Sequence, residues 1–147
     1  MAKDDDRYRR GLHRMEEIGG ARVTADFLAA LSGTAPDLGR YVAEFIYGDL
    51  YCRPGLALPE RQLVTVATLA ALGGCERQLA LHIGVALDAG VTPATLVEAL
   101  IHQCAYAGFP RALNAVAVAR EVFTERGVPL PPQARETVRG GDREWHE

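Results

Sequence analysis

A thiol, an amide and an imidazole lie within one short segment of this chain, at Cys75, Gln78 and His82. The segment follows Gly73-Gly74 and is typical of a helix, on which positions i, i+3 and i+7 share one face. Histidine transfers protons near neutral pH, and a cysteine at a helix start can be reactive. Disulfide cycling within one site needs a second thiol, and this segment holds only Cys75. Taken alone, Cys75, Gln78 and His82 suggest half of a redox centre and are the candidate catalytic residues, while the structural alternative for His82 is a partly buried histidine bonded to a backbone carbonyl.

Proline and glycine divide the rest of the chain into helical segments that must position these side chains. Thr92-Pro93, for example, is typical of a helix start, with an N-cap residue followed by proline. No segment alternates between polar and apolar residues as a half-buried strand would. The sequence predicts helices over residues 5–18, 25–31, 36–46, 59–72, 75–89, 93–107 and 110–126.

The fold class predicted from these segments is all-α, a compact multi-helix bundle. One helical domain is expected over residues 1–127, followed by a C-terminal tail over residues 128–147. Residues 63–72 are apolar nearly all round, which indicates burial in the core together with a subunit interface. We therefore expect a homo-oligomer.

Composition excludes several classes of partner. The 147 residues carry a net charge of -3 and form no basic stripe, so nucleic acid is not expected as a partner. No apolar run is long enough to cross a membrane, and no secretion signal is visible. The three cysteines form neither a C-x-x-C pair nor a metal-type cluster with histidine. These observations predict a cytoplasmic protein with no metal site.

The order of several short motifs resembles that of the γ-carboxymuconolactone decarboxylases. An aromatic-Gly pair precedes an aromatic-x-Arg-Pro-Gly-Leu string within residues 47–56, and Leu-x-x-His follows at residues 79–82. Tyr-Ala-Gly-x-Pro occupies residues 106–110, and Arg-Tyr-x-x-Gly near the N-terminus also matches. The resemblance extends over roughly residues 7–126.

This resemblance implies an all-α subunit that assembles as a trimer or hexamer and needs no cofactor. The implied reaction is loss of carbon dioxide from a carboxylated butenolide, which gives an enol-lactone on the route to 3-oxoadipate, in aromatic compound catabolism. In that reaction His82 would be the proton donor or oxyanion partner, and Gln78 would orient it. Arg53 would clamp a substrate carboxylate, because its planar guanidinium makes two charge-assisted hydrogen bonds.

Further substrate-binding candidates are aromatic or lie on one helical face. Tyr47, Tyr51 and Tyr106 are candidate pocket walls, and the first two replace tryptophans common in the family. Glu98, His102 and Tyr106 share a face at i, i+4 and i+8, which indicates a pocket lining or a subunit contact.

Departures from the family pattern leave alternatives open. Gln78 stands where the family commonly has glutamate, and Gly84 where decarboxylases often have arginine. The related alkyl hydroperoxidase D-type proteins use Cys-x-x-Cys-x-x-x-His with an upstream Arg-Glu-Leu. Here Gln78 replaces the second cysteine and Gln62 the glutamate. The alternatives are a thiol-dependent antioxidant protein centred on Cys75, and a non-decarboxylating relative recruited to another pathway.

Overall fold

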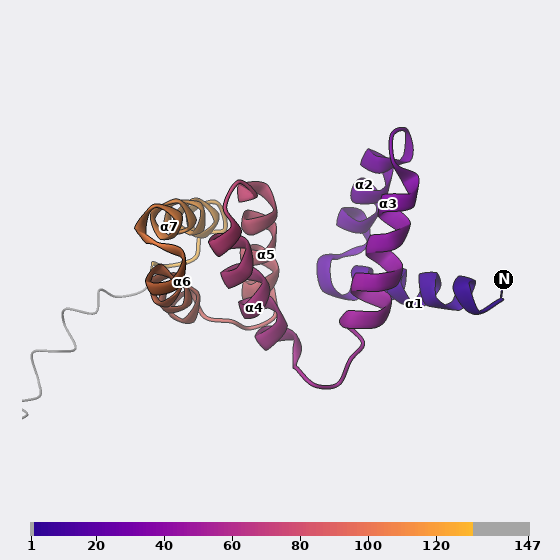
Figure 1. Ribbon diagram of the computed structural model, residues 1–147, viewed down its shortest axis with the longest axis horizontal. Helices are drawn as coiled ribbons and strands as arrows, with labels where there is room; N and C mark the ends of the chain where they lie inside the picture. The colour runs from indigo at the N-terminus through magenta and orange to yellow at the C-terminus, as the bar shows by residue number, and fades with distance from the viewer. Residues whose placement is uncertain (1, 131–147) are drawn as a thin grey trace, which may run out of the picture.

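The computed structural model describes residues 2–130, and it confirms the all-α prediction (Figure 1). The helices are α1 (Ala2–Gly19), α2 (Ala21–Ser32), α3 (Pro36–Tyr41), η1 (Val42–Leu50), α4 (Leu58–Leu72), α5 (Glu76–Asp88), α6 (Pro93–Ala107) and α7 (Phe109–Glu125). The third predicted helix continues to Leu50 because α3 passes directly into η1, which is a π-helix. Most of the predicted tail, residues 131–147, lies outside the described residues. The division into one domain and a tail stays a prediction.

The helices form two groups along the long axis of the molecule. Figure 1 shows α1, α2, α3 and η1 together at one end and α4 to α7 at the other, with residues 51–57 connecting them. Within the described residues no helix is long and apolar enough to cross a membrane.

Helices α4 to α7 enclose the main hydrophobic core. The apolar residues of each helix recur every three or four positions and form one buried stripe, as the sequence pattern predicts. The buried residues of this core, of which Val91 lies in the loop between α5 and α6, are Val66, Ala70, Leu79, Ile83, Ala86, Val91, Leu96, Leu100, Ala115, Val118, Ala119, Val122 and Phe123. The stripe of α4 contains one polar residue, Gln62, which is fully buried one turn before Val66. This glutamine becomes important at the candidate site.

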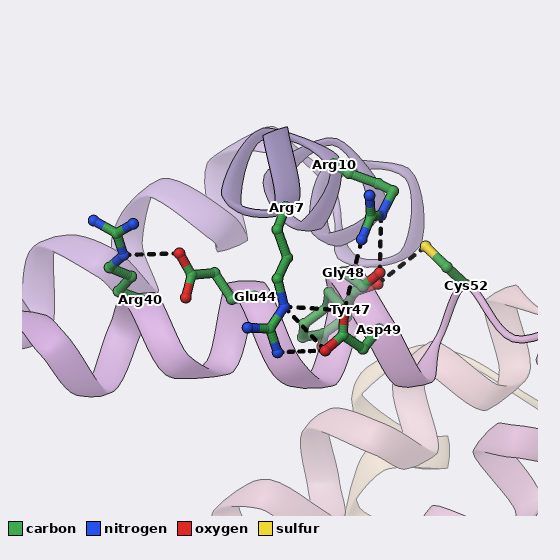
Figure 2. Close-up of polar contacts among 8 residues, drawn as sticks. All are labelled: Arg7, Arg10, Arg40, Glu44, Tyr47, Gly48, Asp49 and Cys52. Carbon is green, nitrogen blue, oxygen red and sulfur yellow. Dashed lines mark hydrogen bonds and ion pairs between the residues drawn. The ribbon is translucent and has the colours of Figure 1, made fainter. Parts of the chain in front are cut away.

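Helices α1 and η1 cross at two glycines. A Cβ at Gly11 would collide with the carbonyl group of Ala43, and a Cβ at Gly48 would lie 2.9 Å from the carbonyl oxygen of Arg7. Figure 2 shows Arg7 and Arg10 reaching from α1 to the end of η1. Arg7 forms an ion pair with Asp49, and Arg10 Nε donates to the carbonyl oxygen of Gly48 over 3.0 Å. The two glycines and the ion pair therefore fix the end of η1, from which residues 51–57 lead to α4.

Local signals explain where the remaining helices begin and end. The backbone N–H of Thr95 donates to Thr92 Oγ1 over 3.1 Å, which confirms the predicted N-cap of α6. Gly73 and Gly74 have φ values of +65° and +71°, a conformation that glycine adopts without strain. This turn ends α4 and folds α5 back along it.

Candidate active site

His82 lies on α5 beside the core residues Leu79 and Ile83 and is partly buried. Its Nδ1 atom is 3.0 Å from Oε1 of Gln62, on the neighbouring helix α4. Burial lowers the pKa of His82 below its ordinary value because desolvation disfavours the charged imidazolium. His82 is therefore neutral at physiological pH in the free protein.

The hydrogen-bond partner of His82 is Gln62. From the sequence we expected Gln78 to orient the imidazole. Gln78 is exposed on α5, although it lies one turn before His82. The amide of Gln62 is fully buried, and its Nε2 donates to the hydroxyl oxygen of Tyr51 over 3.2 Å. One sequence signal for Gln62 was its position in the apolar stripe of α4, where an amide needs a buried partner.

Tyr51 connects this pair to the segment that joins the two helix groups. Its side chain is buried, and its hydroxyl lies 3.5 Å from Oγ1 of Thr65 on α4. The guanidinium of Arg61 lies 6.0 Å from the centre of the Tyr51 ring and donates over 2.6 Å to the carbonyl oxygen of Arg53. Arg61 thus has a structural role, since it holds the Arg53-Pro54-Gly55 turn against Tyr51.

Tyr47 stacks on Tyr51 across one turn of η1, with ring centres 5.0 Å apart. Burial, together with the neighbouring Tyr51, raises the pKa of Tyr47 to about 12. Both rings were predicted as pocket walls, and the structure places them against each other. Only the Tyr51 hydroxyl has a described hydrogen bond to Gln62.

Arg53 lines a hollow of about 430 Å³ between α1 and the connecting segment. The hollow is rich in basic side chains and shares Tyr51 with the His82 network. Its lining residues are Arg10, His13, Arg14, Glu17, Tyr51, Cys52, Arg53, Leu56, Ala57 and Leu58. Such a lining can hold a carboxylate, as the predicted role of Arg53 requires.

Cys75 belongs to a different hollow, of about 290 Å³, that also involves Arg111 and Asn114. Its thiol donates to the carbonyl oxygen of Leu69 over 3.3 Å. This contact bridges the turn between α4 and α5, and it gives the thiol a structural partner. The structure thus associates Cys75 with the turn, while His82 pairs with Gln62.

The remaining candidates lie on the surface of the helices. His102 and Tyr106 are exposed on α6, with ring centres 5.4 Å apart. Arg126 donates to the carbonyl oxygen of Gly84 over 3.0 Å and pairs with Asp88, so a guanidinium lies beside Gly84. In the part of the chain that the structure describes, no group of three or more His, Cys, Asp or Glu side chains could hold a metal ion.

Comparison with known proteins identifies the family of this chain. Residues 36–121 match the Carboxymuconolactone decarboxylase family. The 4-carboxymuconolactone decarboxylase of Acinetobacter baylyi is 35% identical over 125 residues, which cover 85% of this chain and 92% of the relative. The chain belongs to the carboxymuconolactone decarboxylase family. A second relative, the nitrosuccinic acid decarboxylase npaB of Metarhizium robertsii, is 24% identical over 128 residues, which cover 84% of this chain and 89% of the relative.

Family membership gives the geometry a chemical context. Both relatives are named as decarboxylases, which supports a carboxy-lyase kind of activity for this family member. The aromatic-x-Arg-Pro-Gly-Leu string places Tyr51 in the His82 network and Arg53 in the basic hollow. The Leu-x-x-His string places Leu79 in the core and His82 next to it. Two motifs that are separate in sequence thus converge on one hydrogen-bonded cluster.

Proposed function

We propose that this protein is a cofactor-independent carboxy-lyase that acts on a carboxymuconolactone or a related lactone or oxo acid. The observation that carries the proposal is the partly buried His82, held on α5 by the buried amide of Gln62. Family membership and the two relatives named as decarboxylases support the same reaction class.

The proposed reaction needs a proton donor and an anion anchor. When the ring carboxylate leaves as carbon dioxide, the electron pair of the broken C–C bond spreads into the unsaturated lactone. The substrate itself is therefore the electron sink, and a cofactor has no step to perform. The dienolate then takes one proton at carbon. Catalysis by a positioned acid contributes about 10²–10⁴-fold to such a step.

His82 is the proposed source of this proton. It is neutral in the free protein because burial lowers its pKa. An anionic substrate bound next to the ring favours the charged imidazolium, since an opposite charge stabilises it. His82 would therefore take up a proton from solvent as the substrate binds, and give that proton to the dienolate carbon after decarboxylation.

Arg53 is the proposed anchor for a substrate carboxylate. It lines the basic hollow together with Arg10 and Arg14, and this hollow adjoins Tyr51. A charge-assisted hydrogen bond of this kind contributes about 1.5–3 kcal/mol, or about 10- to 100-fold in binding. We expect the binding of a dicarboxylate substrate to depend on Arg53.

We also propose that the protein works as a homo-oligomer, a trimer or hexamer, in the cytoplasm. Large apolar side chains are exposed on both helix groups, among them Phe45, Ile101, Phe109 and Leu113, each more than half exposed. Monomeric proteins rarely leave such surface uncovered, and a second copy of the chain is the proposed cover. The three cysteines are all unpaired, in keeping with a reducing compartment.

The direct test is carbon dioxide release from 4-carboxymuconolactone, with related carboxylated lactones and β-oxo acids as a panel. We expect turnover of at least one member, and we expect Arg53→Gln to raise KM by about 10- to 100-fold with a smaller effect on kcat. The matched control is Arg22→Gln, because Arg22 is exposed on α2 and pairs only weakly, over 3.8 Å, with Asp26. Absence of carbon dioxide release from the whole panel would contradict the proposal.

A further inference from the structure

Four side chains form one hydrogen-bonded row that ends at His82. Oγ1 of Thr65 is 2.9 Å from the carbonyl oxygen of Arg61, and the Tyr51 hydroxyl is 3.5 Å from Thr65. Nε2 of Gln62 is 3.2 Å from the Tyr51 hydroxyl, and Oε1 of Gln62 is 3.0 Å from Nδ1 of His82. Tyr51 and Gln62 are buried, while Thr65 and His82 are partly buried.

Thr65, the first side chain of this row, sets the direction of every hydrogen bond in the row. A backbone carbonyl only accepts, so the Thr65 hydroxyl must donate its single hydrogen to Arg61. Thr65 Oγ1 is then left as an acceptor, and the Tyr51 hydroxyl donates to it. The oxygen of Tyr51 in turn accepts from the amide nitrogen of Gln62, and this leaves the amide oxygen of Gln62 facing His82.

The amide oxygen of Gln62 accepts and cannot donate, so the hydrogen between Gln62 and His82 must be carried by Nδ1 of His82. A neutral imidazole carries one hydrogen, and His82 is neutral in the free protein. Its Nε2 atom therefore holds a free lone pair. The opposite orientation of the amide would leave the Tyr51 hydroxyl without a hydrogen for Thr65, so it satisfies fewer of the observed contacts.

We propose that Gln62, oriented by Tyr51 and Thr65, is a positioning residue that keeps the resting hydrogen of His82 on Nδ1 and makes Nε2 the nitrogen that takes up and delivers the catalytic proton. The delivery step rests on the proposed function, whereas the resting tautomer does not. In the reaction, the solvent proton adds to Nε2 as the substrate binds, the C–C bond to the leaving carboxylate breaks, and carbon dioxide departs. The Nε2 proton then moves to the dienolate carbon, and His82 returns to its neutral Nδ1–H form.

An amide suits this role better than a carboxylate would. Glutamate at position 62 would also accept from Nδ1, but its charge would favour the imidazolium before any substrate is present. Glutamine orients the same nitrogen while it adds no charge. The imidazole of His82 then stays neutral without substrate and is protonated when the anionic substrate binds.

The test is nitrogen-15 NMR of the His82 ring in the full-length protein without substrate, at a pH well above the ordinary histidine pKa. The signals are assigned by their loss in His82→Gln. We expect a protonated Nδ1 and an unprotonated Nε2 in the wild type. A ring that is mainly protonated on Nε2 would overturn the proposal without the use of any Gln62 variant.

Two variants and one control extend the test. Gln62→Met should remove the preference for Nδ1–H, and Gln62→Glu should keep it while raising the pKa of His82. Gln103→Met is the matched control, because Gln103 is also a buried glutamine, 7% exposed, and its side chain contacts none of the four residues by a described hydrogen bond. Gln62→Glu with an unshifted His82 titration, or Gln62→Met with the wild-type tautomer, would contradict the proposal.

Kinetics separate this inference from the proposed function. With an active substrate, Gln62→Met should lower kcat by about 100-fold with little change in KM, because a misplaced hydrogen affects proton delivery more than binding. An Nδ1–H ring in a protein that releases no carbon dioxide would remove the proposed function and the delivery step, and would leave the resting tautomer in place. A KM effect alone would overturn the positioning role.

Discussion

The two buried glutamines should respond in opposite ways to the same substitution. Gln62 is fully buried and bonds to both His82 and Tyr51. Gln103 is 7% exposed, and among the described residues neither Nε2 nor Oε1 of its side chain has a partner. We therefore expect Gln62→Met to lower the free energy of unfolding and Gln103→Met to leave it unchanged or raise it.

The magnitudes follow from the groups that each change leaves behind. Methionine at position 62 leaves Nδ1 of the partly buried His82 without a hydrogen-bond partner in either tautomer, which costs about 1–3 kcal/mol. Tyr51 keeps Thr65 as an acceptor, so its hydroxyl adds little. Methionine at position 103 removes two unsatisfied polar atoms, which is neutral or stabilising by about 1 kcal/mol. The two variants should thus differ by about 1–4 kcal/mol.

Urea unfolding, followed by far-ultraviolet circular dichroism, measures this difference. All proteins must be compared at one protomer concentration, because assembly adds a concentration-dependent term to stability. A difference of about 1–4 kcal/mol corresponds to roughly 2–16 °C in Tm for a protein of this size class. The reasoning is refuted if Gln62→Met is as stable as the wild type, or if Gln103→Met loses as much stability as Gln62→Met.

Three other changes test separate parts of the structure. Gly11→Ala should destabilise the protein by more than about 2 kcal/mol in urea unfolding, because its Cβ collides with the carbonyl of Ala43, whereas Gly33→Ala has open space and should change stability by less than about 1 kcal/mol. The pKa of His82 is lowered in the folded state, so the unfolded chain takes up a proton first on acidification. The free energy of unfolding should fall as the pH drops below about 6.5 toward the folded pKa, and His82→Gln should flatten this part of the profile. Leu113→Glu, at a side chain that is 67% exposed, should reduce the sedimentation coefficient of the assembly without unfolding the subunit.

Each of these three has a clear contrary outcome. Equal stability of Gly11→Ala and Gly33→Ala would mean that α1 does not cross η1 at Gly11. An unchanged acid profile in His82→Gln would assign the loss of stability to other groups. A wild-type sedimentation coefficient for Leu113→Glu would place the subunit interface elsewhere.

The helices were predictable because the signals that end them are local. Proline at helix starts and glycine at helix ends act on the chain within a few residues, so Thr92 and the Gly73-Gly74 turn could be read directly. The π-helical winding of η1 could not be predicted from local signals, because it accompanies a crossing with α1 at Gly11 and Gly48, which are far apart in sequence.

The partner of His82 could not be predicted from spacing on its own helix. Spacing on a single helix favoured Gln78, four residues before His82, but that side chain is exposed. The actual partner, Gln62, is 20 residues away in sequence. It lies next to His82 because the Gly73-Gly74 turn folds α5 back along α4. Helical periodicity predicts which side chains share a face, and only packing decides which face meets another helix.

The most direct test of the account is the rate of carbon dioxide release from 4-carboxymuconolactone by the wild type and by His82→Gln, at equal concentrations of folded protein. The account predicts turnover by the wild type and a loss of about 100-fold or more in kcat for His82→Gln, because the proton donor is gone. Equal turnover by the two proteins would contradict the central role of His82.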